Sequence, residues 1–170
     1  ANDAFKPVTR YFDRITRPEQ IISSLQQAVQ VMLDPADCGP ACIALSQDVQ
    51  GETFDYPEEF FAERIHHIRR SRPDDLQVKQ AAELIKKSKQ PILISGGGVF
   101  YSEAMNELSE FAKKHNIPVT QTVMGFSTLK KDHSHYSGAI GGLGGKDANN
   151  LAKETDLAIA VGTKLADFTT

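Results

Sequence analysis

The chain has 170 residues and a formal net charge of −3; 40% of the residues are hydrophobic and 24% are charged. This balance excludes a disordered or collagen-like chain, and the apolar runs are too short for a membrane-spanning helix. The composition predicts a soluble globular protein without the overall positive field that attracts nucleic acid or an anionic membrane.

The two cysteines, Cys38 and Cys42, are too few for a disulfide framework, and no charged and then apolar signal peptide opens the chain. These features favour a reducing compartment, so we expect a cytoplasmic location. The sequence starts at Ala1 without an initiator Met and reaches Thr170 without a helix or strand stop signal. We therefore expect a piece of a longer polypeptide.

The first predicted helix covers residues 18–32. Thr16 and Glu19 have the spacing of a capping box, with Pro18 in the first turn. The residues that recur at helical spacing are Ile21, Ile22, Leu25, Ala28, Val29 and Met32. After turn residues, the short apolar run 41–45 predicts a buried parallel strand, whose edges this segment leaves unpaired.

Residues 51–73 have no sustained periodicity, and they begin with aromatic and acidic residues and end with arginines. We expect a linker that packs on a surface through its aromatic side chains. The basic run that includes Arg64 and Arg69 could suggest nucleic acid, but acidic residues surround it, so we favour a solvated linker with internal ion pairs.

From residue 74 onward, helix and strand patterns alternate. Strands are predicted at 92–95, 118–122 and 157–161, with a loop at 123–140 between the second and the third. The first helix begins after Asp74 or Asp75, the second is capped by Ser102, and the third passes through Ala148. Their inward residues are Val78, Ala81, Ala82 and Ile85, then Ala104, Leu108, Phe111 and Ala112, then Ala148, Leu151 and Ala152. Strands joined by such helices form a doubly wound α/β domain with a parallel sheet.

Two glycine clusters follow predicted strands, where an α/β sheet places its ligands. Residues 96–98 carry the first two glycines of a dinucleotide fingerprint, but Tyr101 stands where the third should be. A structural turn between strand and helix is the favoured interpretation, with close approach to a ligand as the alternative.

The second cluster, residues 141–145, leads directly into a helix. A helix start offers amide donors and a positive dipole end, so Gly142, Gly144 and Gly145 are the candidate anion site, with Lys146 adding charge. A nucleotide-hydrolysing P-loop is excluded because no Gly-Lys-Ser/Thr ending is present. Close helix packing or a mobile loop remains the alternative.

Other candidate groups give weaker signals. His133 and His135 could supply a metal or a general base, but no third ligand has a usual spacing, so solvated or interface histidines are favoured. The same holds for His66 and His67, and for the two cysteines, which lack two further zinc ligands. The residues alone therefore indicate a scaffold without a complete active site.

Several motifs resemble the thiamine-diphosphate enzymes of the acetolactate-synthase type. They lie at residues 5–11, 18–20, 39–49, 91–98, 116–119 and 161–165. Further motifs, at residues 12–18, 45–50, 138–141 and 167–170, resemble the branch that acts in inositol catabolism. The resemblance implies that residues 1–50 end a pyrimidine-binding domain, that 51–73 form a linker, and that 74–170 form most of a central domain, incomplete at its C-terminus.

The resemblance also implies a function for the full-length parent: a hydrolase that opens a cyclic 1,2-diketone at a C–C bond and gives 5-deoxy-glucuronate. Its cofactors would be thiamine diphosphate and Mg²⁺, and its small-molecule substrate would be the diketone, with no nucleic acid or membrane partner. The alternatives are an acyl-transferring synthase of the same superfamily and a non-catalytic module that binds FAD or ADP.

Residues of the family that activate the cofactor and hold its diphosphate belong to other segments. The pair Asn149 and Asn150 has no Gly-Asp-Gly before it. We therefore expect no catalytic residue, no metal ligand and no tight cofactor binding in this chain. Because the apolar helix of residues 18–32 would lack the rest of its domain, we expect a homo-oligomer in which residues 1–50 pair with another copy.

Overall fold

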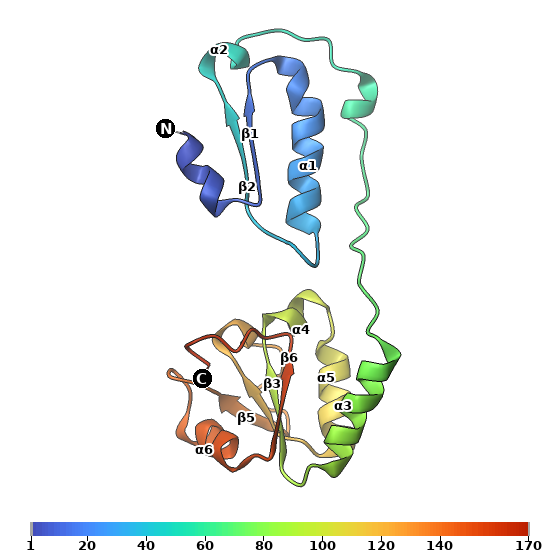
Figure 1. Ribbon diagram of the computed structural model, residues 1–170, viewed down its shortest axis with the longest axis vertical. Coiled ribbons are helices and arrows are strands. Elements are labelled where there is room, and N and C mark those ends of the chain that lie inside the picture. Colours follow the sequence, from blue (N-terminus) through green and yellow to red (C-terminus); the bar gives the residue numbers. More distant parts are fainter. Residues whose placement is uncertain (1, 170) are drawn as a thin grey trace. The chain divides into compact units, whose positions relative to one another are not determined.

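The computed structural model describes residues 2–169 and divides into two compact units, with the border between Arg72 and Pro73. Figure 1 shows that each unit has its own strands and helices. Within the described residues, none of the helices has the length and apolar character that crossing a bilayer requires.

The first unit is built around two parallel strands, β1 (Tyr11–Ile15) and β2 (Ala41–Leu45). The helix α1 (Ile21–Leu33) contacts both strands, and Ile15, Ala28 and Ala44 are buried between them. The remaining elements are the short helices η1 (Asn2–Val8), η2 (Pro18–Gln20), α2 (Gln47–Gln50) and η3 (Glu58–Phe60).

The strand predicted at 41–45 is confirmed, but the prediction that both its edges are unpaired is wrong. β1 pairs with it from Tyr11 opposite Ala41 to Ile15 opposite Leu45. The sequence pattern did not predict β1, because Asp13 and Arg14 interrupt its apolar residues. Asp13 is accommodated because its carboxylate accepts hydrogen bonds from the hydroxyl of Ser24, a buried residue of α1, and from the Arg14 amide.

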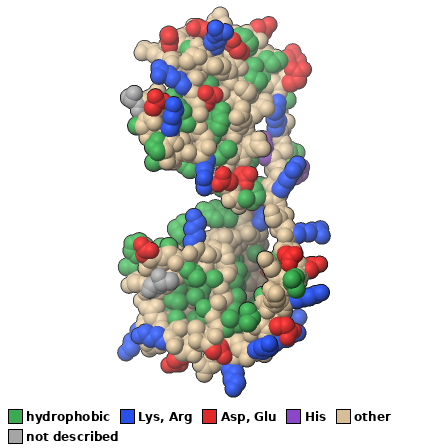
Figure 2. Space-filling view, in the orientation of Figure 1, with side chains coloured by type: hydrophobic (Ala, Val, Ile, Leu, Met, Phe, Trp, Pro, Cys, Tyr) green, Lys and Arg blue, Asp and Glu red, His purple; other side chains and the backbone are tan. Residues whose placement is uncertain are grey.

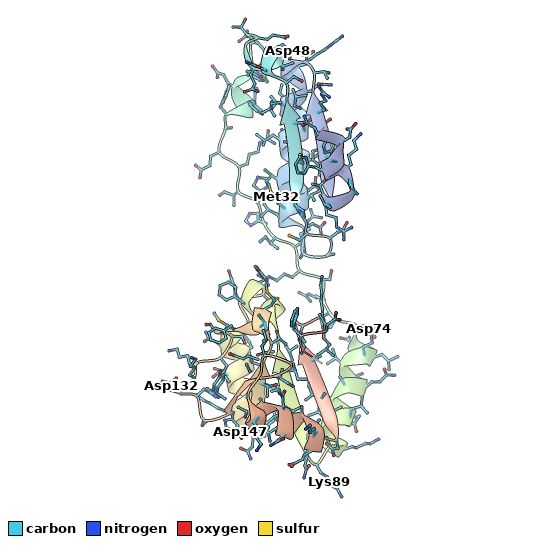
Figure 3. All side chains as sticks on the ribbon, turned by 90° about the vertical axis from the view of Figure 1, so that its left-hand side faces the viewer. Met32, Asp48, Asp74, Lys89, Asp132 and Asp147 are labelled. Atoms are coloured by element: carbon cyan, nitrogen blue, oxygen red, sulfur yellow. The ribbon has the colours of Figure 1, made fainter. Side chains whose placement is uncertain are left out.

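The helix predicted at 18–32 is confirmed as η2 followed by α1, although its start is held differently. The Gln20 side chain, and not Glu19, accepts from the backbone N–H groups of Thr16 and Arg17, at 2.7 and 3.1 Å. The buried residues of α1 are Ser24 and Ala28, while Leu25 and Met32 stay exposed. A sheet of two strands covers only a narrow stripe of a helix, so the outer residues of the predicted apolar face reach solvent (Figure 3 labels Met32).

The aromatic residues of the linker cluster with one another. Tyr56 contacts Phe54, Phe60 and Phe61, with ring centroids 4.9 to 6.1 Å apart, and its hydroxyl donates to the Pro18 carbonyl at 3.2 Å. Linker packing through aromatics is thus present, although Phe61 remains 71% exposed. Residues 61–72 are exposed and contain no helix or strand.

The second unit contains a four-stranded parallel sheet of β3 (Pro91–Ser95), β4 (Val119–Gln121), β5 (Tyr136–Ala139) and β6 (Leu157–Val161) in the spatial order β5-β4-β3-β6. Its helices are α3 (Asp75–Lys87), α4 (Gly97–Tyr101), α5 (Met105–His115), η4 (Val123–Gly125) and α6 (Lys146–Glu154).

Helices cover both faces of this sheet, which confirms the doubly wound α/β class. On one face Leu93 and Val119 pack with Leu108 and Ala112 of α5, and Ile85 of α3 joins them. On the other face Ile92, Ile94 and Ile140 pack with Leu151 and Ala152 of α6. Successive residues of β3 thus point to opposite faces, as a strand buried on both sides requires.

Three local expectations differ from the structure. Ser102 ends α4, and the following helix is capped by Ala104, because the glycines after β3 already form a short helix. Residues 136–139, expected as loop, form β5, whose small and polar residues carry no apolar signal. The helix α3 is capped by Asp74 as expected (Figure 3 labels Asp74), but Val78 is 48% exposed, Ala82 is half-buried, and Ile85 packs against the core of the sheet.

Candidate functional site

The carboxyl edge of the sheet is the candidate site, because ligands of open α/β sheets bind where the strand order reverses. β3 is flanked by β4 on one side and by β6 on the other, so the reversal lies between β3 and β6. The loops that meet there are residues 96–98, which follow β3, and Gly162 with Thr163, which follow β6.

The glycines after β3 pack against the backbone after β6. The Gly96 amide donates to the Val161 carbonyl at 2.9 Å, and the Gly98 amide donates to the Gly162 carbonyl at 2.8 Å. A Cβ on Gly96 would lie 2.4 Å from the Gly162 oxygen, and one on Gly98 would lie 2.6 Å from the Gly162 Cα. The geometry supports the favoured interpretation of this cluster, a structural turn, over close approach to a ligand, because protein backbone fills the space that a ligand would need.

The second glycine cluster also uses its amides within the chain. Gly142 donates to the Phe168 carbonyl at 3.0 Å, Gly144 to Gly141 at 2.8 Å, and Gly145 to Ala139 at 2.9 Å. α6 follows at Lys146 and brings Asp147 into its first turn (Figure 3). In this conformation the glycine amides themselves are not available as donors to an anion.

Asn149 holds the same loop from α6. Its side-chain oxygen accepts from the Gly141 amide at 2.9 Å, and its side-chain nitrogen donates to the Gly141 carbonyl at 3.1 Å. Beside this contact lies a cavity of about 560 Å³, between Ile94 and Ile140 of the sheet region and Lys153 of α6. Asn149 therefore braces the loop, which gives the Asn-Asn pair a structural role here.

A buried polar network lies under the loops that follow β3 and β4, and the sequence patterns did not indicate it. The Ser95 hydroxyl lies 2.8 Å from that of Thr128, and the Gln121 amide donates to Thr128 at 3.3 Å and to the Leu129 carbonyl at 2.9 Å. Among the described residues every buried side-chain nitrogen or oxygen has a partner. The sequence feature that could have indicated it is the run of polar residues 120–122 in the predicted strand 118–122, because buried polar side chains require hydrogen-bond partners within the protein.

The histidine pair is tied to α5. The Nδ1 atom of His133 accepts from the His135 amide at 3.1 Å, and its Nε2 atom lies 3.0 Å from the Ser109 hydroxyl. His135 lies 2.9 Å from the side-chain oxygen of Asn116, at the end of α5. Partial burial, together with the charge of Lys113, lowers the pKa of His133 below its usual value. Both rings therefore have hydrogen-bond partners within the chain and hold the loop against α5, a role that differs from the solvated or interface histidines favoured above.

The other weak candidates also lack partners for a metal. Cys38 donates to the Met32 carbonyl at 3.1 Å, and Cys42 lies within β2. Across residues 2–169, no group of three or more His, Cys, Asp or Glu side chains could hold a metal ion. The linker arginines Arg64 and Arg69 form no ion pair with a carboxylate in this described range, so the expected internal pairing does not include them.

At the opposite, amino edge of the sheet, the carboxylate of Asp156 links two segments of the chain through hydrogen bonds. Asp156 accepts from the Ser88 hydroxyl and from the amides of Lys89 and Gln90, the amides at 2.7 and 3.0 Å (Figure 3 labels Lys89). The Ser88 hydrogen bond, followed by those amides, lowers the pKa of Asp156. These hydrogen bonds join the residue before β6 to the turn before β3, so they hold together the start of the β3–β6 pair.

The fold and the strand order define a class of protein. The family described as "Thiamine pyrophosphate enzyme, central domain" matches residues 78–170. The chain therefore belongs to the thiamine-diphosphate enzymes, and its second unit contains their central domain, as the resemblance implied.

More specific relatives match almost the entire chain. Proteins named 3D-(3,5/4)-trihydroxycyclohexane-1,2-dione hydrolase are 49% identical in Bacillus subtilis (strain 168) and 50% identical in Clostridium perfringens (strain 13 / Type A). Each match extends over 169 residues, which are 99% of this chain and 26% of the relative. The chain thus spans about a quarter of the length of these relatives.

Proposed function

We propose that the chain is part of a thiamine-diphosphate-dependent hydrolase that cleaves a C–C bond of 3D-(3,5/4)-trihydroxycyclohexane-1,2-dione and gives 5-deoxy-glucuronate in inositol catabolism. The observation that carries the proposal is the identity of about 50% that extends through both units and the linker. A likeness confined to residues 78–170 would support only the superfamily.

The described residues do not fit a site for thiamine diphosphate with Mg²⁺. No cluster of metal ligands is present among them, and the glycine amides of the loop 141–145 donate to backbone carbonyls. When bound to the parent, the cofactor would supply a nucleophilic carbon and an electron sink for the adjacent carbanion. We propose that other segments of the parent hold it, and that residues 73–170 serve as a rigid scaffold beside them.

Activity of the parent tests this proposal. The parent, loaded with thiamine diphosphate and Mg²⁺, should consume the diketone and one water and release one acid per ring opened, which a pH indicator or mass spectrometry detects. Carbon dioxide release from a 2-keto acid with transfer of the acyl group would instead establish the synthase. A purified parent that carries FAD or ADP and shows neither reaction would favour the nucleotide module.

For the 170-residue chain alone, we propose that it neither binds thiamine diphosphate tightly nor opens the ring. Calorimetry with thiamine diphosphate and Mg²⁺ should give no heat of binding at micromolar concentrations. A micromolar Kd together with ring opening would show that the chain contains a site in a conformation other than the one described.

An anion site at the loop of Gly142, Gly144 and Gly145 also remains a proposal, with the adjoining start of α6 in place of the glycine amides as the source of donors. It is supported by the adjoining helix start, where the amides of residues 146–148 have no hydrogen-bond partner among the described residues. ADP should raise the melting temperature, and Lys146→Gln should reduce that shift. An equal shift in the variant, or no shift in either protein, would remove the site.

We further propose a cytoplasmic homo-oligomer in which residues 1–50 contribute to pairing. The support is the exposure of Leu25, Met32 and Leu45 on α1 and β2, which a soluble chain tends to cover. Sedimentation equilibrium at micromolar concentration should show a dimer that Leu25→Glu weakens. A monomer in which the first 50 residues exchange rapidly would show that this segment does not pair.

A further inference from the structure

A polar cavity of about 460 Å³ lies within the first unit, between the last turns of α1 and the linker. Its walls come from two sources: Gln26, Gln30 and Asp34 at the end of α1, and the segment from Arg64 to Arg69. The volume is in the range of small-molecule pockets and is sufficient for a molecule of sugar size. This cavity is far along the chain from the carboxyl edge of the sheet in the second unit.

The linker wall provides unpaired positive charge. Arg64 and Arg69 both line the cavity, and neither forms an ion pair with a carboxylate among residues 2–169. Within the described residues, Arg64 donates a long hydrogen bond, 3.5 Å, to the Glu59 carbonyl. Figure 2 shows blue and purple side chains along the linker beside the first unit. An arginine presents a planar fork of donors that matches the two oxygens of a carboxylate or phosphate.

The helix wall provides neutral donors and acceptors. Gln26 and Gln30 are four residues apart, so their amides lie on the same side of α1. Neither amide has a hydrogen-bond partner in the part of the chain that the structure describes. An amide can both donate to and accept from a hydroxyl group, which is the requirement for binding a polyhydroxylated molecule.

The negative charge in the cavity is smaller than the positive charge available. Asp34 lines the wall, but its carboxylate accepts from the amides of Asp37 and Ala36 at 2.9 and 2.8 Å, which lowers its pKa. The carboxyl end of α1 adds about half a negative charge. The two arginines that line the cavity outweigh these negative charges.

We propose that this cavity binds a small polyhydroxylated acid of sugar size: Arg64 and Arg69 hold its acid group, and Gln26 and Gln30 bind its hydroxyls. The acid group is a carboxylate or a phosphate, which the two arginines recognise by the same chemistry. The site rests on the residues of the first unit and is independent of the reaction proposed for the parent.

The test compares ligands that differ only in the acid group, with the 170-residue chain followed by amide NMR at pH 6 and low salt. D-glucuronate and glucose 6-phosphate are the acids, and glucose is the neutral control. We expect either acid to shift the amide signals of residues 26–34 and 64–69 with a Kd of millimolar or below, whereas glucose does not. The tighter of the two acids identifies the acid group.

Matched variants separate the site from a general charge effect. The double variant Arg64→Gln/Arg69→Gln should weaken binding at least tenfold, and Gln26→Ala should weaken it severalfold. Arg72→Gln removes one positive charge from the linker outside the cavity, as the single variants Arg64→Gln and Arg69→Gln each do inside it. It should change the Kd less than twofold, whereas each of those single variants should weaken binding more than twofold. The proposal is overturned if Arg72→Gln is as damaging as the double variant, if glucose binds equally well, or if neither acid shifts these signals. Tighter binding of an oligonucleotide that depends equally on all three arginines would indicate a nucleic-acid surface instead and would also overturn it.

Discussion

The contact between Gly96 and the backbone after β6 predicts a large difference between two glycine substitutions that are otherwise alike. Gly96 and Gly145 both follow a strand, both have extended backbones, and both are the N-cap residue of the next helix. Gly96→Ala would place a methyl group 2.4 Å from the Gly162 oxygen and 2.5 Å from the Thr163 Cβ. At Gly145 the same methyl group has no atom within 4 Å.

Because both glycines are N-cap residues with extended backbones, the destabilisation caused by the steric contact at Gly96 can be isolated by comparing the two variants. Loss of a glycine N-cap and the lower entropy of the unfolded chain affect both variants similarly, so they cancel in the comparison. The remaining term is the forced insertion of a methyl group into packed backbone, which typically costs about 1–3 kcal/mol. For a unit of this size we expect Gly96→Ala to melt roughly 4–24 °C below Gly145→Ala.

The assay has to report on the second unit alone, because the chain consists of two compact units and both substitutions lie in the second. Urea titrations followed through the amide signals of β3, such as that of Leu93, meet this condition, and Leu93 is buried in the sheet. Equal midpoints for the two variants, within about 0.5 kcal/mol after conversion, would refute the reasoning. They would show that the space at the strand reversal is open in solution and available to a ligand.

Three further substitutions test the hydrogen bonds described above. Ser24→Ala should destabilise the first unit by about 1–3 kcal/mol in urea unfolding, because it leaves Asp13 without its buried hydroxyl partner. That hydroxyl also lowers the pKa of Asp13, so the stabilisation that the variant loses is the part present above about pH 4 and absent in acid. If the stability of the variant depended on pH in the acid range as that of the unsubstituted chain does, the reasoning would be wrong. The pKa of His133 is lowered in the folded chain, so the contribution of His133 to the stability is present above about pH 6.5 and declines as the pH falls below that value. His133→Gln should therefore make the stability of the second unit less dependent on pH between about pH 7 and 5. A variant as pH-dependent as the unsubstituted chain would contradict this. Asp156→Asn should lower the midpoint of the second unit and accelerate amide exchange at Gln90, whereas Asp132→Asn, on an exposed loop of the same unit, should do neither.

Much of the second unit is predictable because β3 and β6 are nearly continuous apolar runs. Residues 92–95 are buried, whereas residues 157–161 form an edge strand whose residues are half-buried or exposed, and the helical spacing around Leu108 and Ala112 requires a face on the sheet. β1 and β5 are different, since Asp13 lies in one and Gly138 in the other. Their strand conformation depends on parallel partners far along the chain, which a local pattern does not contain.

The candidate site is less predictable than the fold, because a glycine in the sequence does not show what approaches it. In the sequence, Gly96 and Gly142 look alike, because each belongs to a glycine cluster near the end of a strand. In the structure Gly96 faces protein backbone, and Gly142 faces open space. The roles of Ser95 and Gln121 were also hidden, because a buried polar side chain becomes visible only when its partners on other elements are known.

The position of β6 beside β3 has a consequence for synthesis of the chain. β4 and β5 leave the ribosome soon after β3, so one side of β3 is paired early, while its other side waits for β6, which begins about 62 residues after β3 ends. At ~5–20 residues per second this interval lasts roughly 3–12 s. During it, the growing chain presents an apolar edge centred on Ile92 and Ile94, which favours pairing with other strands. We therefore expect the pair of β3 with the edge strand β6 to be the last strand pair of the sheet to form during synthesis, and the open edge of β3 to be the segment that a chaperone protects.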